Sequence, residues 1–490
     1  MQLTRHYAAA CLLALFTTHA FAVDLPTTTY LPIVAGTPQT RSTPFIAWHE
    51  DLADSGYVEA EYLVSGDANI YAYVDNAAHS SVVRIRDDAV RYTSRILVRR
   101  PLDPERFNGT VYLEVLNATA GWDGDPIWQN THDYMIRAGA AYVGLTSKPL
   151  ALNFLRDKWG STEGFAIRNN DRYASLEMPF FGQVWDMVSE VAALMKSADS
   201  ADNPLAGFDV KRIILTGYSQ SVAYQVTYAN SFHDRATMPS GEPVIDGYFL
   251  AAGGARAKNV NRPAPAEESL PAGDPRNLVK VGVPVVRFQT QTEVGTFGSQ
   301  TVRQSEVAYP LIRTFEMAGG AHVDVATNES GGHALARDLG LASFGAGCDL
   351  AINPIRIGFV QSALLAVTDR WVGGAAPPPR SRLLSLVKDP TGASVIEVDA
   401  AGNAVGGLRP PTLQVPLGTY LPTNTGQGFC FLMGGFVAFG EQELKRRYPS
   451  HRDYVEQMAQ QIDRAVSEEF LLEADAIRLY AHTNQSTLGR

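Results

Sequence analysis

Segments with the pattern of a strand alternate with segments with the pattern of a helix from about residue 109 to residue 322. Runs rich in β-branched and aromatic residues, bounded by Gly, Pro or Asn, predict strands at 56–66, 92–101, 109–117, 140–148, 212–219, 244–254, 282–293 and 312–322. Apolar residues at helical spacing predict helices at 126–139, 180–197 and 220–232. The alternation predicts an α/β fold with a doubly wound, mostly parallel sheet, which binds ligands at the carboxyl ends of its strands.

The composition changes after residue 322. We expect a helix at 354–372, a proline-rich linker at 373–379, a Gly/Pro-rich insertion at 395–417 and charged amphipathic helix from 441 to about 482. The chain is therefore expected to have a core at 23–349 and a C-terminal appendage at 350–490. The appendage either covers the mouth of the ligand site as a cap or completes the core, and the sequence favours neither.

Residues 1–22 have the features of a secretory signal peptide. Arg5 and His6 precede an apolar stretch, and Ala-Phe-Ala at 20–22 fits a cleavage site. The stretch is too short to span a bilayer comfortably, and no later segment has the long uncharged run of a membrane helix. We expect an exported protein, periplasmic or extracellular; an uncleaved N-terminal anchor is the alternative.

The acidic composition indicates which classes of binding partner are disfavoured. The formal net charge of −10 becomes −11 when Arg5 leaves with the leader. An acidic surface argues against nucleic acid and anionic membranes as partners. Nothing in the sequence indicates an oligomeric state.

Two cysteines, Cys348 and Cys430, remain once the leader and its Cys11 are removed. An oxidising compartment favours a disulfide between them, and two buried free thiols are the alternative. The ten histidines are scattered, with no C-x-x-C or H-E-x-x-H spacing, so no metal site is expected.

The segment ILTGYSQSVAY places Ser219 between a predicted strand and a predicted helix. Gly217 precedes the serine by two residues, and Ser221 stands where the usual G-x-S-x-G motif has its second glycine. Small neighbours allow strand and helix to approach closely around a tight turn that lifts the serine Oγ above the sheet. The pattern favours Ser219 as a nucleophile; an ordinary helix N-cap is the alternative.

A serine nucleophile needs a general base and a carboxylate that orients the base. In this kind of sheet the two follow the serine in the order acid, then histidine. Glu293 lies just past one predicted strand and His322 just past the next, so we predict Glu293 as acid and His322 as base. Asp274 and Asp324 are alternative acids, and His333 is an alternative base.

Two backbone amides are expected to bind the negatively charged oxygen of the reaction. They belong to Gln220, directly after the serine, and to Ala118 in the loop 114–123. Aromatic residues in segments that lead toward this site can line a substrate pocket, although core packing is their commoner role: Trp122, Trp128, Phe180, Phe181 and Trp185.

Six segments occur in the order EVLNATAGWD, DRYASLEMPFFGQVWDMVSEV, ILTGYSQS, QTQTEVG, EMAGGAHVD and GNAVGGLRPPTLQVPLGTY. From about residue 25 onward the chain thereby resembles a group of large secreted α/β-hydrolase-domain proteins, most specifically in G-x-S-Q-S and G-N-A-x-G-G-x-R-x-P. The resemblance implies an α/β-hydrolase fold with Ser219 as nucleophile, Glu293 as acid and His322 as base. It also implies that Cys348 and Cys430 occupy cysteine positions of the family.

These observations predict a secreted serine hydrolase that cleaves a small-molecule or polymeric carboxylic ester through an acyl-enzyme. The chemistry requires no metal and no organic cofactor. An acyltransferase with the same residues is an alternative, because the exclusion of water decides between them. A non-catalytic binding protein on the same scaffold is a third, which the intact Ser, Glu and His set disfavours.

Overall fold

A computed structural model describes residues 21–34, 42–159, 170–260, 268–303, 309–341, 345 and 347–489. Most of the expected leader, residues 1–20, therefore lies outside the described residues. None of the helices in the described ranges combines the length and hydropathy that crossing a bilayer requires.

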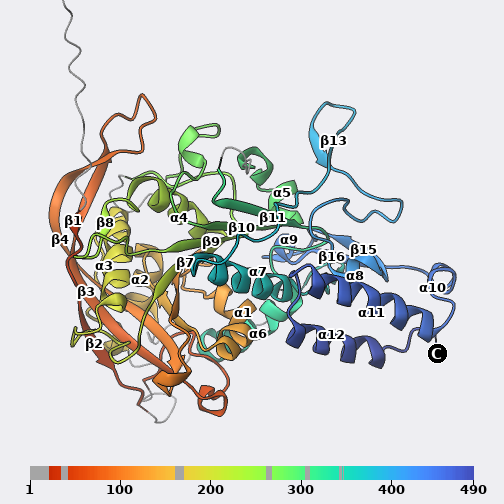
Figure 1. Ribbon diagram of the computed structural model, residues 1–490, viewed down its shortest axis with the longest axis horizontal. Helices are drawn as coiled ribbons and strands as arrows, with labels where there is room; N and C mark the ends of the chain where they lie inside the picture. Colours follow the sequence, from red (N-terminus) through yellow and green to blue (C-terminus); the bar gives the residue numbers. More distant parts are fainter. Residues whose placement is uncertain are drawn as a thin grey trace, which may run out of the picture.

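A nine-stranded sheet runs through the described part of the chain (Figure 1). Its strands, in spatial order, are β11 (Ile312–Met317), β10 (Val285–Thr290), β9 (Gly247–Ala251), β7 (Arg212–Tyr218), β5 (Thr110–Val115), β6 (Ala141–Leu145), β4 (Val83–Pro101), β3 (Tyr57–Tyr73) and β2 (Thr27–Leu31). The strands from β11 to β6 are mutually parallel, and β4, β3 and β2 continue the sheet in antiparallel order. The predicted mostly parallel sheet is confirmed.

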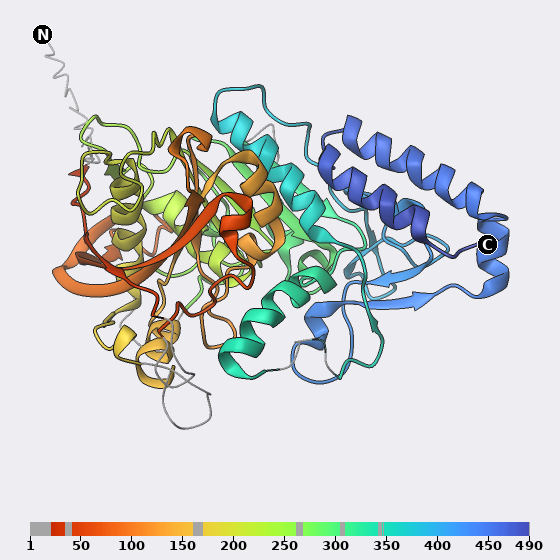
Figure 2. The same ribbon diagram turned by 90° about the horizontal axis from the view of Figure 1, so that it is seen from below.

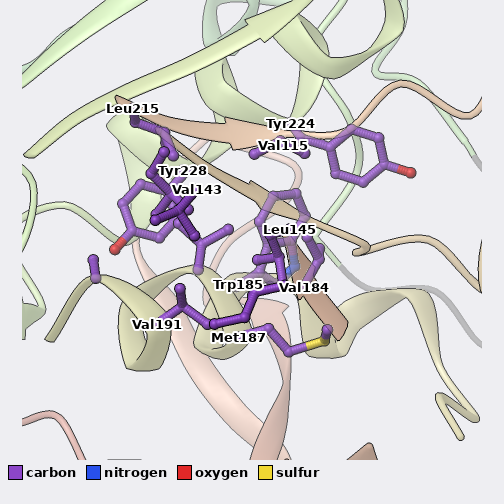
Figure 3. Packing of buried hydrophobic residues seen from close by; sticks show 14 of the residues in the cluster. Val115, Val143, Leu145, Val184, Trp185, Met187, Val191, Leu215, Tyr224 and Tyr228 are labelled. Atoms are coloured by element: carbon purple, nitrogen blue, oxygen red, sulfur yellow. The ribbon is translucent and has the colours of Figure 1, made fainter. Parts of the chain in front are cut away.

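Helices cover both faces of this sheet because its strands alternate their side chains between two apolar cores. Val111 and Leu113 of β5 face one core, whereas Tyr112 between them faces the other. The first core contains α3 (Val184–Lys196) and α4 (Gln220–Ser231). Figure 3 shows Trp185 and Val191 of α3 facing Leu215 and Tyr228, in β7 and α4.

The second core contains α1 (Pro126–Ala138) and α7 (Ile357–Val372), which pack against each other and against the sheet. The helix α6 (Val325–Leu339) packs beside α1. The remaining elements are β1 (Phe21–Ala22), α2 (Pro149–Asn153), β8 (Ala236–Thr237), α5 (Gln291–Gly295), β12 (Ala351–Ile352), β13 (Leu386–Lys388), β14 (Ser394–Ile396), α8 (Pro411–Gln414), β15 (Gly418–Leu421), α9 (Cys430–Met433), β16 (Gly435–Ala438), α10 (Glu441–Arg447), α11 (His451–Ser467) and α12 (Glu473–Gln485).

Several predicted strands end earlier than expected, and β10 shows the reason most clearly. The strand predicted at 282–293 stops at Thr290, and the short helix α5 follows. The reason is a capping box: the Thr290 hydroxyl accepts a hydrogen bond from the Thr292 N–H, and the Glu293 carboxylate accepts one from the Thr290 N–H. This box fixes Glu293 at the carboxyl end of β10.

The C-terminal segment 350–490 packs extensively against the core. Its helix α7 lies in the second apolar core, and short parallel bridges pair Phe315 with Arg382 and Met317 with Leu408 along the outer edge of β11. Beyond these, α11 and α12 form a helical hairpin at the far end of the molecule (Figure 2). A boundary at residue 349 stays a prediction, although α7 shows that the segment contributes to the core.

A disulfide links Cys348, which follows α6, to Cys430 at the start of α9. The two Cα atoms are 5.3 Å apart and the residues are separated by 82 positions. The pairing agrees with the expectation from the sequence. It ties the segment after α6 to a segment that lies beyond the Gly/Pro-rich insertion.

Loss of this disulfide should lower the stability of the protein. Closing a loop of this length stabilises the folded state by about 4 kcal/mol in the chain-entropy model. We expect no reactive thiol in the denatured, unreduced mature protein, and a lower urea midpoint for Cys430→Ser. Two titratable thiols per chain would contradict the pairing.

Two glutamates lie in the cores with hydrogen bonds from tyrosines. Glu114 accepts from Tyr142 at 2.8 Å, and Glu190 accepts from Tyr92 at 2.6 Å. Burial raises the pKa of each carboxyl group to about 8. The folded protein therefore keeps protons that the unfolded chain releases between the usual carboxyl pKa and about pH 8.

The contribution of Glu190 should make the protein less stable as pH rises. Because its folded pKa is raised, the stabilising effect is complete below the unfolded pKa and is lost as pH approaches about 8. We expect the unfolding free energy of Glu190→Gln to fall less between about pH 5 and pH 8 than that of the wild type, measured by urea unfolding. The exposed Glu242→Gln is the control, and equal slopes for Glu190→Gln and wild type would contradict the prediction.

Candidate active site

Ser219 occupies a single-residue turn between β7 and α4. Its backbone angles are φ 57° and ψ −117°, a conformation that is strained for any residue other than glycine. Its side chain makes no capping hydrogen bond, so the alternative role as an ordinary N-cap does not hold. A strained serine at a sharp strand-to-helix turn is the geometry of a nucleophile elbow.

Small residues around the turn let β7 and α4 approach closely. A Cβ at Gly217 would lie 2.9 Å from the Ser221 Cβ and 3.0 Å from the Gln225 Oε1, which is too close for any side chain there. The sequence signal at Gly217 therefore has a steric cause. A small residue suffices at Ser221, whose hydroxyl is buried below the turn.

His322 and Glu293 meet at the same edge of the sheet. His322 Nδ1 lies 2.6 Å from Glu293 Oε1, and both side chains are buried. The other carboxylate oxygen accepts the Thr290 N–H at 2.5 Å, and the Thr292 hydroxyl accepts the His322 N–H at 3.1 Å. The carboxylate is therefore fixed by β10 and α5, and it holds the imidazole with Nε2 left for another partner.

The alternative acids have other structural roles. Asp324 caps α6 through the Thr327 N–H and accepts the Ile357 N–H at 2.6 Å, so it joins the starts of α6 and α7. Asp274 pairs with Arg276 and with His79. Neither carboxylate contacts His322 in the described structure.

The alternative base, His333, stacks on His49 with ring centroids 4.7 Å apart. It projects from α6 and is absent from the wall of the cavity at Ser219. His322 is thus the histidine that shares a cavity with Ser219.

This cavity has a volume of about 150 Å³ and is mostly apolar. Ser219 and His322 both lie on its wall. No hydrogen bond joins Ser219 Oγ to His322 among the described residues; such bonds often tighten only when substrate is bound. The wall is completed by residues of the loop after β5, of α6 and of the appendage, among them Asn117, Ala120, Trp122, Gly124, Thr327, Gly331, Ala334, Leu335, Phe429, Leu432 and Met433.

The loop after β5 presents an amide that has no acceptor. Asn117 is held at both its backbone and its side chain, which donates to the Tyr218 carbonyl at 3.0 Å, and the Thr119 N–H donates to Asn117 Oδ1. The N–H of Ala118 between them has no hydrogen-bond acceptor among the described residues, although Ala118 is buried. A buried amide without an acceptor is costly, and a ligand oxygen would satisfy it.

Two buried arginines under this loop were missed by the sequence reasoning. Arg95 of β4 pairs with Glu61 at 2.5 Å and with Asp123 at 3.1 Å. Arg99, four residues on, pairs with Asp125 at 2.5 Å. Asp123 and Asp125 lie at the end of the loop after β5. Their ion pairs with the two guanidinium groups therefore hold this end of the loop against β4. The available signal was that the two arginines flank the apolar run Ile96, Leu97 and Val98.

Lys148 is a second residue that the sequence reasoning missed. Its side chain is almost completely buried, donates to the Leu116 carbonyl and lies 3.0 Å from Ser221 Oγ. Leu116 precedes the loop with the Ala118 amide, and Ser221 lies in the first turn of α4. One ammonium group therefore connects the two segments that border Ser219. Its position at the end of the strand predicted at 140–148 was the available signal.

The five aromatic candidates divide between cavity and core. Trp122 lies on the cavity wall. Trp128 and Trp185 are buried in the two apolar cores, and Phe181 is also buried away from the cavity. Phe180 does not line the cavity either. In their place the appendage supplies Phe429, Leu432 and Met433, at and next to the disulfide-bonded α9.

The wall from the appendage is attached directly to the histidine segment. The N–H of Val323, the residue after His322, donates to the Leu432 carbonyl at 2.9 Å. The Tyr218 hydroxyl donates to the His322 carbonyl at 2.5 Å, and burial raises the pKa of Tyr218 well above its usual value. Tyr218 therefore remains a neutral donor that links the serine turn to the histidine loop.

Solved structures resemble part of this chain at low sequence identity. A serine hydrolase without a lid from Xanthomonas campestris is 12% identical, with a TM-score of 0.27 over 51% of this chain and 91% of that one. Acetyl xylan esterase 1 from Thermoanaerobacterium sp. JW/SL YS485 is 10% identical, with a TM-score of 0.28 over 59% and 80%. A lipase/esterase from Lactobacillus plantarum is 14% identical, with a TM-score of 0.26 over 46% and 86%. At these scores the resemblance says nothing of activity.

The family assignment rests on a different match. No protein among those with curated descriptions matches the chain. The model of a protein family described as an alpha/beta hydrolase domain matches residues 30–481, which is most of the sequence. The chain therefore belongs to this α/β-hydrolase family.

Proposed function

We propose that the protein is a serine hydrolase that cleaves carboxylic esters, with Ser219 as nucleophile, His322 as general base and Glu293 as the orienting acid. The observation that carries the proposal is a strained serine that shares one cavity with a histidine whose Nδ1 is bonded to a buried carboxylate. Strained backbone and a buried, oriented imidazole both cost stability, and such features cluster at catalytic sites.

In the proposed reaction His322 Nε2 accepts the Ser219 hydroxyl proton as Oγ bonds to the ester carbonyl carbon. The carbonyl oxygen becomes negatively charged and is stabilised by the Ala118 and Gln220 backbone amides. The bond to the alkoxy oxygen then breaks, and the imidazolium returns its proton to the leaving alcohol. A water molecule, deprotonated by His322, then bonds to the acyl carbon; the bond to Ser219 Oγ breaks, the imidazolium returns its proton to Oγ, and the carboxylic acid is released. Glu293 stabilises the imidazolium in both halves through its hydrogen bond to Nδ1.

The cavity indicates the size of the acyl group. Its volume of about 150 Å³ is below that of pockets that enclose drug-sized ligands. Apolar side chains from the loop after β5, from α6 and from α9 surround it. We therefore propose esters of short acyl chains, whose leaving group extends out of the cavity, as substrates.

We also propose that the protein works in an oxidising compartment after export. The disulfide between Cys348 and Cys430 supports this, since such bonds persist outside the reducing cytosol. The features of a signal peptide at residues 1–22 point the same way.

Replacement of the nucleophile should abolish hydrolysis. We expect Ser219→Ala to lower kcat by several orders of magnitude on p-nitrophenyl esters and to prevent labelling by a serine-directed phosphonate. The wild type should prefer acetyl and butyryl over long-chain esters in the same assay. Full activity of the folded variant would show that Ser219 is not the nucleophile.

Replacement of the acid tests the role of Glu293. Glu293→Gln removes the charge that stabilises the imidazolium and can reverse the preferred tautomer of His322, so we expect kcat to fall by several orders of magnitude with little change in KM. Asp274→Asn, which alters a carboxylate outside the site, should retain wild-type kcat. A severe loss in Asp274→Asn together with an active Glu293→Gln would refute the assignment.

A further inference from the structure

A second and much larger cavity lies within the appendage. Its volume is about 870 Å³, and its lining comes from α7, α8, α11, α12 and the segments between them, with Val325 of α6 as the one lining residue from the core. Neither Ser219 nor His322 reaches it. The volume falls in the range of pockets that enclose small organic ligands.

The floor of this cavity is apolar. Tyr420, Met458 and Leu479 are buried below it, and Phe359 and Phe436 are half-buried beside them. These side chains come from the start of α7, from the sheet of β12, β16 and β15, and from the α11–α12 hairpin. The floor can therefore accept an alkyl or aryl group without leaving polar atoms unpaired.

Positive charge gathers around this apolar floor. The basic and acidic residues that line the cavity are five arginines, one histidine and one glutamate. Arg382 and Arg464 share the single carboxylate of Glu468, each at 2.9 Å. The whole chain has a formal net charge of −10, so the cavity is opposite in sign to the protein around it.

The other arginines of the cavity differ in how they are paired. Arg409 and Arg478 pair with Asp399 and Asp133, both outside the lining. Arg356, at the N-cap of α7, is exposed and has no ion pair or hydrogen bond to its side chain within the described residues. Glu468, Asp399 and Asp133 thus pair with four of the five guanidinium groups. Arg356 interacts with the buried carboxylate of Asp324 at longer range, without an ion pair in the described structure, so its guanidinium can still bind an external anion.

We propose that this cavity binds an amphipathic carboxylate, a small organic acid whose apolar body lies on the floor and whose carboxylate pairs with Arg356. Arginine favours such a partner because its planar fork matches a carboxylate and its charge strengthens the hydrogen bonds. A neutral molecule of the same shape would gain the apolar contacts only, and a short acid would gain the charge only. The site is separate from the proposed esterase centre and does not depend on it.

Isothermal titration calorimetry with octanoate, octan-1-ol and acetate tests the proposal. The protein is first treated with a serine-directed phosphonate so that the cavity at Ser219 is filled. We expect one saturable octanoate site and at least about tenfold weaker binding of octan-1-ol and acetate. Arg356→Gln should weaken octanoate binding by about tenfold, the usual effect of losing a charge-assisted hydrogen bond.

Arg84→Gln is the matched control, because Arg84 is likewise exposed and unpaired in the described structure but lies on the β3–β4 hairpin. It should bind octanoate as the wild type does. Absence of saturable octanoate binding, equal binding of octan-1-ol, or equal affinities of Arg356→Gln and Arg84→Gln would overturn the proposal. A phosphonate that fails to label Ser219 would count against the proposed esterase only, and the comparison of the two arginine variants would then be made on unmodified protein.

Discussion

Two arginines buried in β4 determine much of the site above them. Arg95 and Arg99 have no exposed surface, and a buried guanidinium without a counter-charge would cost several kcal/mol. Arg95 pairs with Glu61 and Asp123, and Arg99 pairs with Glu59 and Asp125. The two aspartates lie at the far end of the loop after β5, which also contains Ala118. The candidate oxyanion amide thus belongs to a loop whose far end is held by ion pairs in the core.

The sheet and the appendage divide the site between them. The candidate residues Ser219, Glu293 and His322 lie where parallel strands end. Part of the cavity wall comes instead from α9, which the chain reaches only after it has crossed the outer edge of β11. Rigid strand ends preserve the geometry of proton transfer, and a separate segment sets the shape of the pocket. Such a division allows substrate preference to change without disturbing the reacting groups.

The sequence predicted the central sheet and the residues at its carboxyl edge because local patterns encode both. Strand composition located β7, β10 and β11, and Gly217 signalled the tight turn because no side chain fits there. The roles of Arg95 and Lys148 depend on partners that lie far away in the sequence, so no local pattern reveals them. The same holds for Leu432, whose place beside the histidine loop results from the disulfide and a single backbone hydrogen bond. The capping box of Thr290 and Glu293 is a local signal that places Glu293 on α5 rather than on a strand, and the predicted strand 282–293 did not take it into account.

The disulfide between Cys348 and Cys430 bears on the stage of maturation at which the cavity at Ser219 is complete. The bond fixes the start of α9, and α9 supplies part of the wall of the cavity at Ser219. In a chain whose sheet has folded but whose thiols are not yet oxidised, Ser219 and His322 would be in place, whereas the part of the cavity wall from α9 would not yet be fixed. Selectivity would then be acquired after the serine and histidine are in place, at the moment of oxidation. Oxidation of the two thiols, which depends on the compartment, would then be the last event that shapes the substrate preference of the protein.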